Sequence, residues 1–387
     1  MKSIVKILIT TDLYTTKTNG VVTSVNNLCD ELVKKGHDVK ILTLSESAHS
    51  YKDENVYYIR SMPFAVYPDV RMPLSYRHPL IKELVSWKPD VVHSQCEFFS
   101  LQFAKYITKK TKAPLVHTYH TLYEQYVNYV IPSKRLGNYA VRKLSKSRLK
   151  RAAKVIAPTK KVERALVGYG VENSIAVIPS GIKLDQHKIR FSSAEREQKR
   201  KELGIADDQT VIINLGRLGT EKNLSELVDY FSRVCQKRDD VVFLIVGDGP
   251  AKKLLEKQSE ELGISDRVIF TGMVKPTEVQ LYYQLGDVFV SASTSETQGL
   301  TYVEAAANGL PLICRRDPCI EEVVFEGENG YQYDTEEEFA SKLDKVISDR
   351  EWRLSASKRS EEIAEIYDKE NFGNAVEEVY KSVVGNL

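Results

Sequence analysis

The chain has 387 residues, which is more than one ordinary hydrophobic core accommodates and therefore favours two domains. Hydrophobic residues make up 42% of it and charged residues 28%, a composition that is typical of globular proteins and excludes fibrous or low-complexity chains. No apolar run reaches the roughly 18–20 residues that span a bilayer, and we expect no signal peptide at residues 1–10. The five cysteines have no zinc-site spacing, and their odd number argues against a disulfide framework.

The net charge of +2 conceals an asymmetry between the two halves of the chain. Residues 1–180 contain 28 Lys/Arg and 14 Asp/Glu, whereas residues 181–387 contain 27 and 39. A basic half of this kind indicates contact with an anionic surface. Because no nucleic-acid-binding module accompanies the charge, we expect no nucleic-acid partner.

Strand and helix patterns alternate along the first half. Residues 4–9 form an apolar run that predicts a strand, and residues 21–35 predict a helix that ends at Gly36. Further strands are predicted at 39–44, 56–60, 90–93, 115–118, 154–157 and 176–178. This alternation indicates right-handed βαβ units and hence a doubly wound sheet.

Residues 63–80, PFAVYPDVRMPLSYRHPL, interrupt this pattern with four prolines. Proline at this density disfavours a regular helix, so we expect an extended loop with exposed apolar side chains. The loop could bind an acceptor or dip into a membrane. A loop packed on the protein surface is equally compatible with the sequence.

Residues 133–154 contain nine basic residues and no acidic residue. Val141, Leu144, Leu149, Ala152 and Ile156 form an imperfect apolar stripe at helical spacing. A basic amphipathic helix predicts binding to an anionic membrane surface, although a helix docked on its own domain would have the same pattern. The predicted membrane-binding residues are Lys134, Arg135, Arg142, Lys143, Lys146, Arg148, Lys150 and Arg151.

A second alternating series follows a polar linker that we expect near residues 180–200. Strands are predicted at 210–215, 241–246, 267–270, 288–290 and 312–314, and helices at 336–347, 352–367 and 372–384. The expected architecture is α/β, with two Rossmann-like domains facing across a cleft, and ligands at the carboxyl ends of the strands. We expect domains at 1–185 and 186–365, with a helix in 366–387 that returns to the N-terminal domain.

The most informative stretch is SASTSETQGLTYVEAAANG at residues 291–309. Seven residues separate Glu296, in the loop after a predicted strand, from Glu304, about two turns into a short helix. The first N–H groups of that helix lack intrahelical partners and can bind a diphosphate, and a carboxylate further on can accept hydrogen bonds from a ribose diol. This pattern suggests a sugar-nucleotide site. The residues at the start of the helix are Gly299, Leu300 and Thr301.

Three other loops follow strands of the same half. GRLGTEKN begins at Gly216 and places Arg217 and Lys222 where both could bind a diphosphate. The turns GDGP at residues 247–250 and TGMV at 271–274 are weaker signals, because such turns are common without a ligand. Backbone groups near Val274 could contact a nucleotide base.

In this order and spacing, GRLGTEKN, VGDGP, FTGMV and SETQGLTYVEA resemble the retaining GT-B glycosyltransferases of the sucrose-synthase/glycogen-synthase-like family, over essentially the whole chain. The resemblance implies that Arg217 and Lys222 hold the donor diphosphate, with no requirement for a divalent metal or a tightly bound cofactor. It implies that Glu304 binds the ribose and that Glu296 positions the donor sugar. The backbone at residues 299–301 would contact phosphate. In the first half, it implies that Gly20 approaches the β-phosphate and that His120 reaches the hexose.

The stretches NGVVTSV, CEFFSL and YHTLYEQYVNY further resemble the diacylglycerol glucosyltransferases of Gram-positive bacteria and mollicutes. This resemblance implies transfer of glucose from UDP-glucose to the 3-hydroxyl of 1,2-diacylglycerol by a peripheral enzyme at the cytoplasmic face of the membrane. Glu97 and Tyr123 are the predicted acceptor-binding residues. The alternatives are another acceptor, such as a glycolipid or a teichoic, capsular or phosphoinositide acceptor, or a catalytically silent lipid-binding paralogue. The UDP-sugar 2-epimerases share the two-domain fold but lack this glutamate pair at this spacing beside a GRLGTEKN-like loop.

Overall fold

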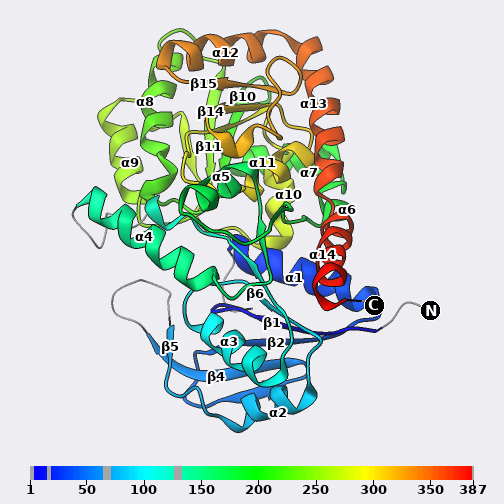
Figure 1. Cartoon of the computed structure of the whole chain (residues 1–387). Coiled ribbons are helices and arrows are strands. Elements are labelled where there is room, and N and C mark those ends of the chain that lie inside the picture. The colour runs from blue at the N-terminus through cyan, green and yellow to red at the C-terminus, as the bar shows by residue number, and fades with distance from the viewer. Residues whose placement is uncertain (1–3, 15–18, 64–70, 126–132, 386–387) are drawn as a thin grey trace. The chain divides into compact units, whose positions relative to one another are not determined.

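The computed structural model describes residues 4–14, 19–63, 71–125 and 133–385. The chain divides into two compact units (Figure 1). The first unit contains Met1–Ile182 together with Lys369–Leu387, and the second contains Lys183–Asp368. The roles that we predict for the two halves, and the cleft between them, stay predictions.

The first unit is built on a mainly parallel sheet with the strand order β3-β4-β2-β1-β6-β7-β8-β9. Strand β5 (Arg71–Pro73) pairs antiparallel with β4, and β3 also runs antiparallel to β4. The order reverses beside β1, so the chain leaves β1 and β6 in opposite directions along the sheet. The strands are β1 (Lys6–Thr10), β2 (Asp38–Ser45), β3 (Tyr51–Asp53), β4 (Val56–Pro63), β6 (Val91–Ser94), β7 (Leu115–Thr118), β8 (Lys154–Ala157) and β9 (Ile175–Val177).

Helices cover both faces of this sheet (Figure 1). Side chains alternate along β1, so Ile7 and Ile9 join one hydrophobic core and Leu8 joins the other. Helix α1 (Gly20–Lys34) packs on the first of these faces, and α2 (Pro79–Trp87), α3 (Phe99–Thr111) and α5 (Lys160–Gly168) supply the second core. Burial on both faces explains why these strands appear in the sequence as continuous apolar runs.

The last helix, α14 (Lys369–Val384), belongs to the first unit and packs beside α1. Phe372, Val376 and Tyr380 are buried in the core on the α1 face of the sheet. Ion pairs fix the helix at both ends of this contact, because Lys369 Nζ lies 3.0 Å from Glu31 and Lys35 Nζ lies 3.0 Å from Glu377. The end of the chain therefore completes a core that the first residues begin.

The second unit contains a parallel sheet with the order β12-β11-β10-β13-β14-β15. Helices α8 (Leu224–Cys235), α9 (Lys252–Glu261) and α12 (Glu336–Ser348) supply the core on one face. On the other face, the Phe289 ring lies against the rings of Tyr283 and Tyr302, from α10 (Val279–Tyr283) and α11 (Leu300–Ala307). Helix α13 (Arg350–Ala364) packs on α11. The strands are β10 (Thr210–Leu215), β11 (Val241–Val246), β12 (Val268–Phe270), β13 (Val288–Ser291), β14 (Leu312–Arg315) and β15 (Gly330–Tyr333).

The structure corrects the sequence prediction at several elements. The expected linker at 180–200 contains α6 (Leu184–His187) and α7 (Ser193–Glu202), and a capping box between Ser192 and Glu195 starts α7. The proline-rich stretch contains β5 and the start of α2, and residues 64–70 of it lie outside the described residues. The short strands β3, β5 and β15 carry too few apolar residues to be predicted. Among the described residues, no helix has the length and apolar character that crossing a membrane requires.

Candidate functional site

In the second unit, the loops after β10 and β13 lie next to each other at the point where the strand order reverses. Strand β10 pairs with β11 on one side and with β13 on the other. The loop after β10 contains the 3-10 turn η3 (Thr220–Lys222), and the loop after β13 leads into α11. In open α/β sheets, this switch point at the carboxyl ends of the strands is the usual place of a ligand.

Two contacts tie these loops together. Lys222 Nζ forms an ion pair with Glu296, whose side chain is 17% exposed. The Ser295 hydroxyl donates to the Glu221 carbonyl oxygen at 3.0 Å. Two of the predicted donor-site residues are therefore in direct contact.

Arg217 lies on the same loop but has a different partner. Its guanidinium forms an ion pair with Glu221, and its side chain is 58% exposed. Because its guanidinium is open to solvent, Arg217 can exchange this carboxylate for another anion. Arg217 and Lys222 thus each hold a carboxylate of the protein where the sequence predicts a diphosphate.

Two glycines allow the backbone of this site to adopt its shape. Gly299 precedes α11 with φ 69°, and a Cβ there would lie 2.3 Å from the Tyr302 ring. The N-cap residue Gly299 has no side chain that could accept a hydrogen bond from the first N–H groups of α11, at Leu300 and Thr301. Gly247 has φ 131°, and a Cβ there would lie 1.9 Å from the Gly216 carbonyl oxygen, which seats the GDGP turn on the GRLG turn.

Glu304 lies in α11, one turn after its start rather than the predicted two. The buried Tyr283 hydroxyl donates to Glu304 Oε2 at 3.0 Å, and Asn308 Nδ2 donates to the Glu304 carbonyl oxygen at 2.9 Å. Burial raises the pKa of Glu304, and the bond from Tyr283 opposes that rise. The hydrogen bond from Tyr283 fixes one carboxylate oxygen and leaves the other to accept from a further donor.

The carboxylates of Glu304 and Glu296 have separate partners, Tyr283 and Lys222 respectively. Val274 lies in the loop between β12 and the turn η4 (Pro276–Glu278), and is partly buried. This loop lies at the same sheet edge but two strands away from β10.

In the first unit, His120 follows β7 and Gln95 follows the neighbouring strand β6. Gln95 Oε1 lies 2.8 Å from His120 Nε2. Burial, followed by the nearby His117, lowers the pKa of His120 to about 3, so its imidazole is neutral at pH 7. A neutral imidazole here offers one donor and one acceptor.

The predicted acceptor residues Glu97 and Tyr123 contact each other. The Tyr123 hydroxyl donates to Glu97 Oε2 at 2.5 Å, and His117 Nε2 lies 3.2 Å from Glu97 Oε1. Both carboxylate oxygens of Glu97 thus have partners within the first unit.

Gly20 is the first residue of α1, in an exposed position. The Asn19 side chain caps this helix by accepting from Val22 N–H at 2.9 Å. Residues 15–18 before it lie outside the described residues. The start of α1 therefore presents backbone N–H groups at the carboxyl end of β1.

Helix α4 (Lys134–Leu149) carries six of the eight predicted membrane-binding residues, and Lys150 and Arg151 directly follow its end. Its buried side contains Val141, Ser145 and Leu149, whereas Leu144, which we placed in the apolar stripe, is 42% exposed. Leu136 and Tyr139 are 64% and 62% exposed. Among the predicted basic residues, Arg148 is partly buried, and the side chain of Lys134 is not among those that the structure describes. The others are exposed: Arg135, Arg142, Lys143, Lys146, Lys150 and Arg151.

Several residues of this site were missed by the sequence analysis. Tyr283 and Gln95 each hold a predicted site residue, and His117 pairs with Glu97. Asp12, at the end of β1, accepts from Ser100 N–H at 2.6 Å, and burial raises its pKa to about 6. Only Gln95 and Asp12 carried a signal in the sequence, as polar residues just after predicted strands.

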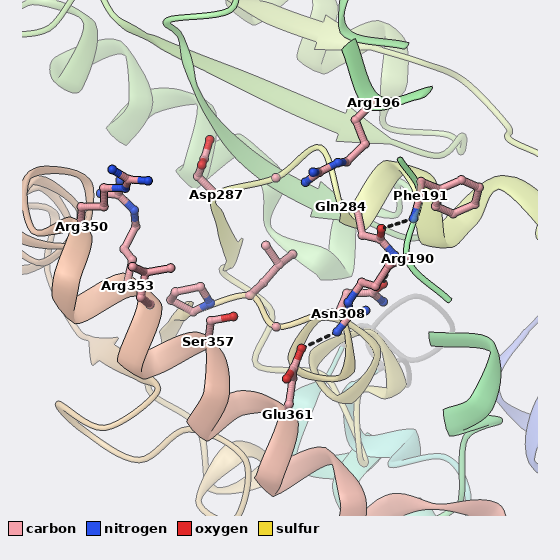
Figure 2. Close-up of a pocket in the computed structure, with 15 residues that line it drawn as sticks. Arg190, Phe191, Arg196, Gln284, Asp287, Asn308, Arg350, Arg353, Ser357 and Glu361 are labelled. Atoms are coloured by element: carbon pink, nitrogen blue, oxygen red, sulfur yellow. Dashed lines mark hydrogen bonds and ion pairs between the residues drawn. The ribbon is translucent and has the colours of Figure 1, made fainter. Parts of the chain in front are cut away.

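A hollow of about 520 Å³ in the second unit lies at the opposite edge of the sheet. It borders Asp287 and Pro311, which immediately precede β13 and β14. Figure 2 shows Arg350 and Arg353 on one side of it and Arg190 and Arg196 on the other. None of the predicted donor-binding residues lines this hollow. Across the described part of the chain, no three His, Cys, Asp or Glu residues are grouped so that they could hold a metal ion.

The two halves match two glycosyltransferase family descriptions. Residues 18–186 match Glycosyltransferase Family 4, and residues 195–363 match Glycosyl transferases group 1. The fold is similar to that of the Anabaena protein HepE, crystallised in complex with UDP and glucose, with a TM-score of 0.78, 20% identity and coverage of 98% and 100% of the two chains. It is also similar to sucrose-phosphate synthase from Thermosynechococcus elongatus, with a TM-score of 0.75, 19% identity and coverage of 97% and 98%.

Two bacterial enzymes are more similar in sequence. The chain is 34% identical to the alpha-monoglucosyldiacylglycerol synthase of Streptococcus pneumoniae, over 97% of this chain and 85% of that one. It is 33% identical to the enzyme of the same name from Acholeplasma laidlawii, over 98% and 97%. The expected two Rossmann-like domains are confirmed, and the chain belongs to the GT-B glycosyltransferases, in the family that includes the alpha-monoglucosyldiacylglycerol synthases.

Proposed function

We propose that this protein transfers glucose from UDP-glucose to the 3-hydroxyl of 1,2-diacylglycerol, with retention of the α configuration, at the cytoplasmic face of the membrane. The observation that carries the proposal is the similarity over nearly the whole chain to two alpha-monoglucosyldiacylglycerol synthases. The five cysteines are free, which agrees with a reducing compartment.

The donor site is the switch point of the second unit. The UDP diphosphate replaces the carboxylates of Glu296 and Glu221 as the partner of Lys222 and Arg217, and the N–H groups at the start of α11 contact it as well. Glu304, held by Tyr283, accepts hydrogen bonds from the ribose hydroxyls. Glu296, once released from Lys222, positions the glucose, and Val274 contacts the base.

The chemical step needs charge stabilisation at the leaving group. The acceptor oxygen bonds to C1 of glucose, the bond from C1 to the β-phosphate oxygen breaks, and a phosphate oxygen takes the proton of the acceptor hydroxyl. Negative charge grows on the diphosphate as the bond breaks, so the cations and oriented N–H groups beside it lower the barrier. Arg217 and Lys222 thereby serve in the place that a divalent metal takes in other transferases.

The acceptor is taken from a membrane surface through the first unit. Helix α4 exposes basic residues together with Leu136, Tyr139 and Leu144, and Lys143 is two turns from Leu136 on the same side. Cations attract an anionic surface, and the exposed apolar side chains can enter the interface between water and lipid. Glu97 and Tyr123 bind the glycerol hydroxyl, and His120 contacts the hexose.

A transfer assay tests this function. The purified full chain is given radiolabelled UDP-glucose or UDP-galactose and diacylglycerol in mixed micelles, with and without anionic lipid, beside a Lys222→Ala control. Labelled monoglucosyl lipid, formed from UDP-glucose and lost in the control, is the expected result. UDP release without glycolipid would move the acceptor to another lipid or polymer, and an absence of both turnover and UDP binding would indicate a catalytically silent protein.

A further inference from the structure

Three buried side chains, Tyr380, His93 and Gln95, link the C-terminal helix to the partly buried His120 through hydrogen bonds. Tyr380 Oη of α14 lies 2.7 Å from His93 Nδ1, and Gln95 Nε2 lies 3.2 Å from His93 Nε2. The other end of the Gln95 amide, Oε1, lies 2.8 Å from His120 Nε2. Tyr380, His93 and Gln95 are at most 2% exposed, so water does not compete for these bonds.

The polarity of the amide fixes the position of each proton along this chain. An amide nitrogen only donates, so His93 Nε2 is the acceptor, and its single lone pair is shared between Gln95 and the Thr118 hydroxyl, which lies 2.7 Å away. The single proton of His93 is then on Nδ1 and is donated to Tyr380 Oη. An amide oxygen only accepts, so His120 carries its proton on Nε2 and its lone pair on Nδ1.

We propose that Tyr380 is a positioning residue for His120: through His93 and Gln95 it fixes which nitrogen of the His120 imidazole carries the proton. The proposal rests on the proposed function in giving His120 a contact with the hexose. The contact between α14 and the end of β6 joins residues 287 positions apart in the sequence, so the end of the chain controls a site residue near its start.

Tyr380 can determine the tautomer of His120 only while the imidazoles of His93 and His120 are both neutral, because a protonated ring donates from both nitrogens. Burial lowers the pKa of His93 well below its usual value, and the neighbouring His117 and His120 lower it further. The pKa of His120 falls to about 3 for the same first cause. Both rings therefore hold one proton each at pH 7.

Removing the Tyr380 hydroxyl should reverse the donor and acceptor roles in the hydrogen bonds that join His93, Gln95 and His120. In Tyr380→Phe, a proton on His93 Nδ1 would be a buried donor without an acceptor, which is costly. The proton moves instead to Nε2, where Thr118 Oγ1 accepts it. The Gln95 amide must then rotate to present its oxygen to His93, its nitrogen donates to His120 Nε2, and His120 takes its proton on Nδ1.

Nuclear magnetic resonance of isotope-labelled histidine tests this directly, because the nitrogen shifts of a neutral imidazole report which nitrogen is protonated. We expect the Nε2–H form of His120 in the wild type and the Nδ1–H form in Tyr380→Phe, with the signal assigned by its loss in His120→Gln. The matched control is Tyr367→Phe, which removes a buried hydroxyl that donates to the Glu322 carbonyl in the second unit. His120 in the Nε2–H form in Tyr380→Phe would overturn the proposal.

A second pair of variants separates the proposed effect of Tyr380→Phe on His120 from a general loss of packing. Gln95→Leu interrupts the chain, so adding Tyr380→Phe to it should leave the His120 spectrum and kcat unchanged from those of Gln95→Leu alone. In the otherwise unchanged protein, we expect Tyr380→Phe to lower kcat about tenfold, as for the loss of one well-placed hydrogen bond, with little change in KM for UDP-glucose. If Tyr380→Phe had the same effect in the wild type and in Gln95→Leu, the proposal that Tyr380 acts on His120 through Gln95 would be contradicted.

The readouts separate this proposal from the proposed function. If the wild type makes no glycolipid, the proposed function fails, whatever the His120 tautomer is. If the wild type makes glycolipid and Tyr380→Phe leaves the His120 tautomer unchanged, the proposed function stands and the proposed role of Tyr380 fails.

Discussion

The two units hold their predicted site residues in different ways. In the second unit, Lys222 and Arg217 form ion pairs with Glu296 and Glu221 on adjoining loops. In the first unit, His120 and Glu97 belong to buried networks that reach Tyr380 and His117. The ion pairs lie within one short stretch or between two neighbouring loops, whereas the network of His120 needs the last helix of the chain.

This difference separates a site built to exchange partners from one built to stay fixed. The Arg217 and Lys222 side chains are 58% and 28% exposed, so a diphosphate can reach these cations from solvent and replace Glu221 or Glu296 as their partner. A buried hydrogen-bond network is expensive to open, because each unpaired group loses its partner without gaining water. We therefore expect substitutions in the second unit to act on the donor, and substitutions in the first unit to act on geometry.

The largest effect should come from Lys222→Ala. Loss of this cation removes charge stabilisation at the leaving diphosphate, and we expect kcat to fall about 10²–10³-fold. The affinity for UDP, measured by calorimetry, should fall as well. Glu304→Ala should also lower the affinity for UDP. The control is Lys257→Ala, whose exposed pair with Glu261 lies on α9. Wild-type UDP affinity in both Lys222→Ala and Glu304→Ala would show that the donor site lies elsewhere.

The basic residues of α4 and of the two positions that follow it should have the next largest effect. Replacing Lys143, Lys150 and Arg151 by Gln removes three exposed cations, each of which contributes about 1 kcal/mol near an anionic leaflet. Binding to anionic vesicles, measured by sedimentation, should weaken about hundredfold and should also fall with rising salt. A triple Gln substitution at Lys109, Lys110 and Lys112 of the α3 end removes the same charge as a control. Equal loss in both variants would assign the attraction to total charge rather than to α4.

Acid should destabilise the second unit through His187. This buried histidine bonds Asn308 Nδ2 at 3.0 Å, and burial lowers its pKa to about 4. The unfolded chain therefore binds a proton near pH 6.5, before the folded unit does, so stability falls as the pH drops through this window. The loss is about 1 kcal/mol per pH unit. Thermal unfolding between pH 6.5 and 4.5 should show this slope in the wild type and a smaller one in His187→Gln; parallel slopes would contradict it.

The smallest effect should come from Tyr283→Phe. Glu304 would lose the donor that orients its carboxylate, at a cost of about 1 kcal/mol, so the Kd of UDP should rise severalfold. Because kcat depends on the leaving group rather than on the ribose, it should change less than Kd. The control is Tyr367→Phe, whose hydroxyl bonds Glu322. A Kd that equals the wild-type value would remove Tyr283 from the donor site.

The sequence predicts the second unit better than the first because its motifs are local. Lys222 and Glu296 lie in loops directly after strands that can be recognised, so their meeting follows from the parallel sheet. The bond between Tyr283 and Glu304 could not be predicted, since it depends on how α10 packs on α11. The same holds for Tyr380, because no sequence pattern places the last helix against β6. Leu144 was misplaced because helical spacing alone cannot show which side of α4 meets the domain.

The structure of the product tests the central claim most directly. Wild-type protein and the Lys222→Ala control would be incubated with UDP-glucose and 1,2-diacylglycerol, and the glycolipid analysed by proton magnetic resonance for its anomeric configuration and point of attachment. We predict a single product with an α-linked glucose on the 3-hydroxyl of the glycerol, and none from the control. A β-linked product, or an unglycosylated diacylglycerol beside consumed UDP-glucose, would contradict the account.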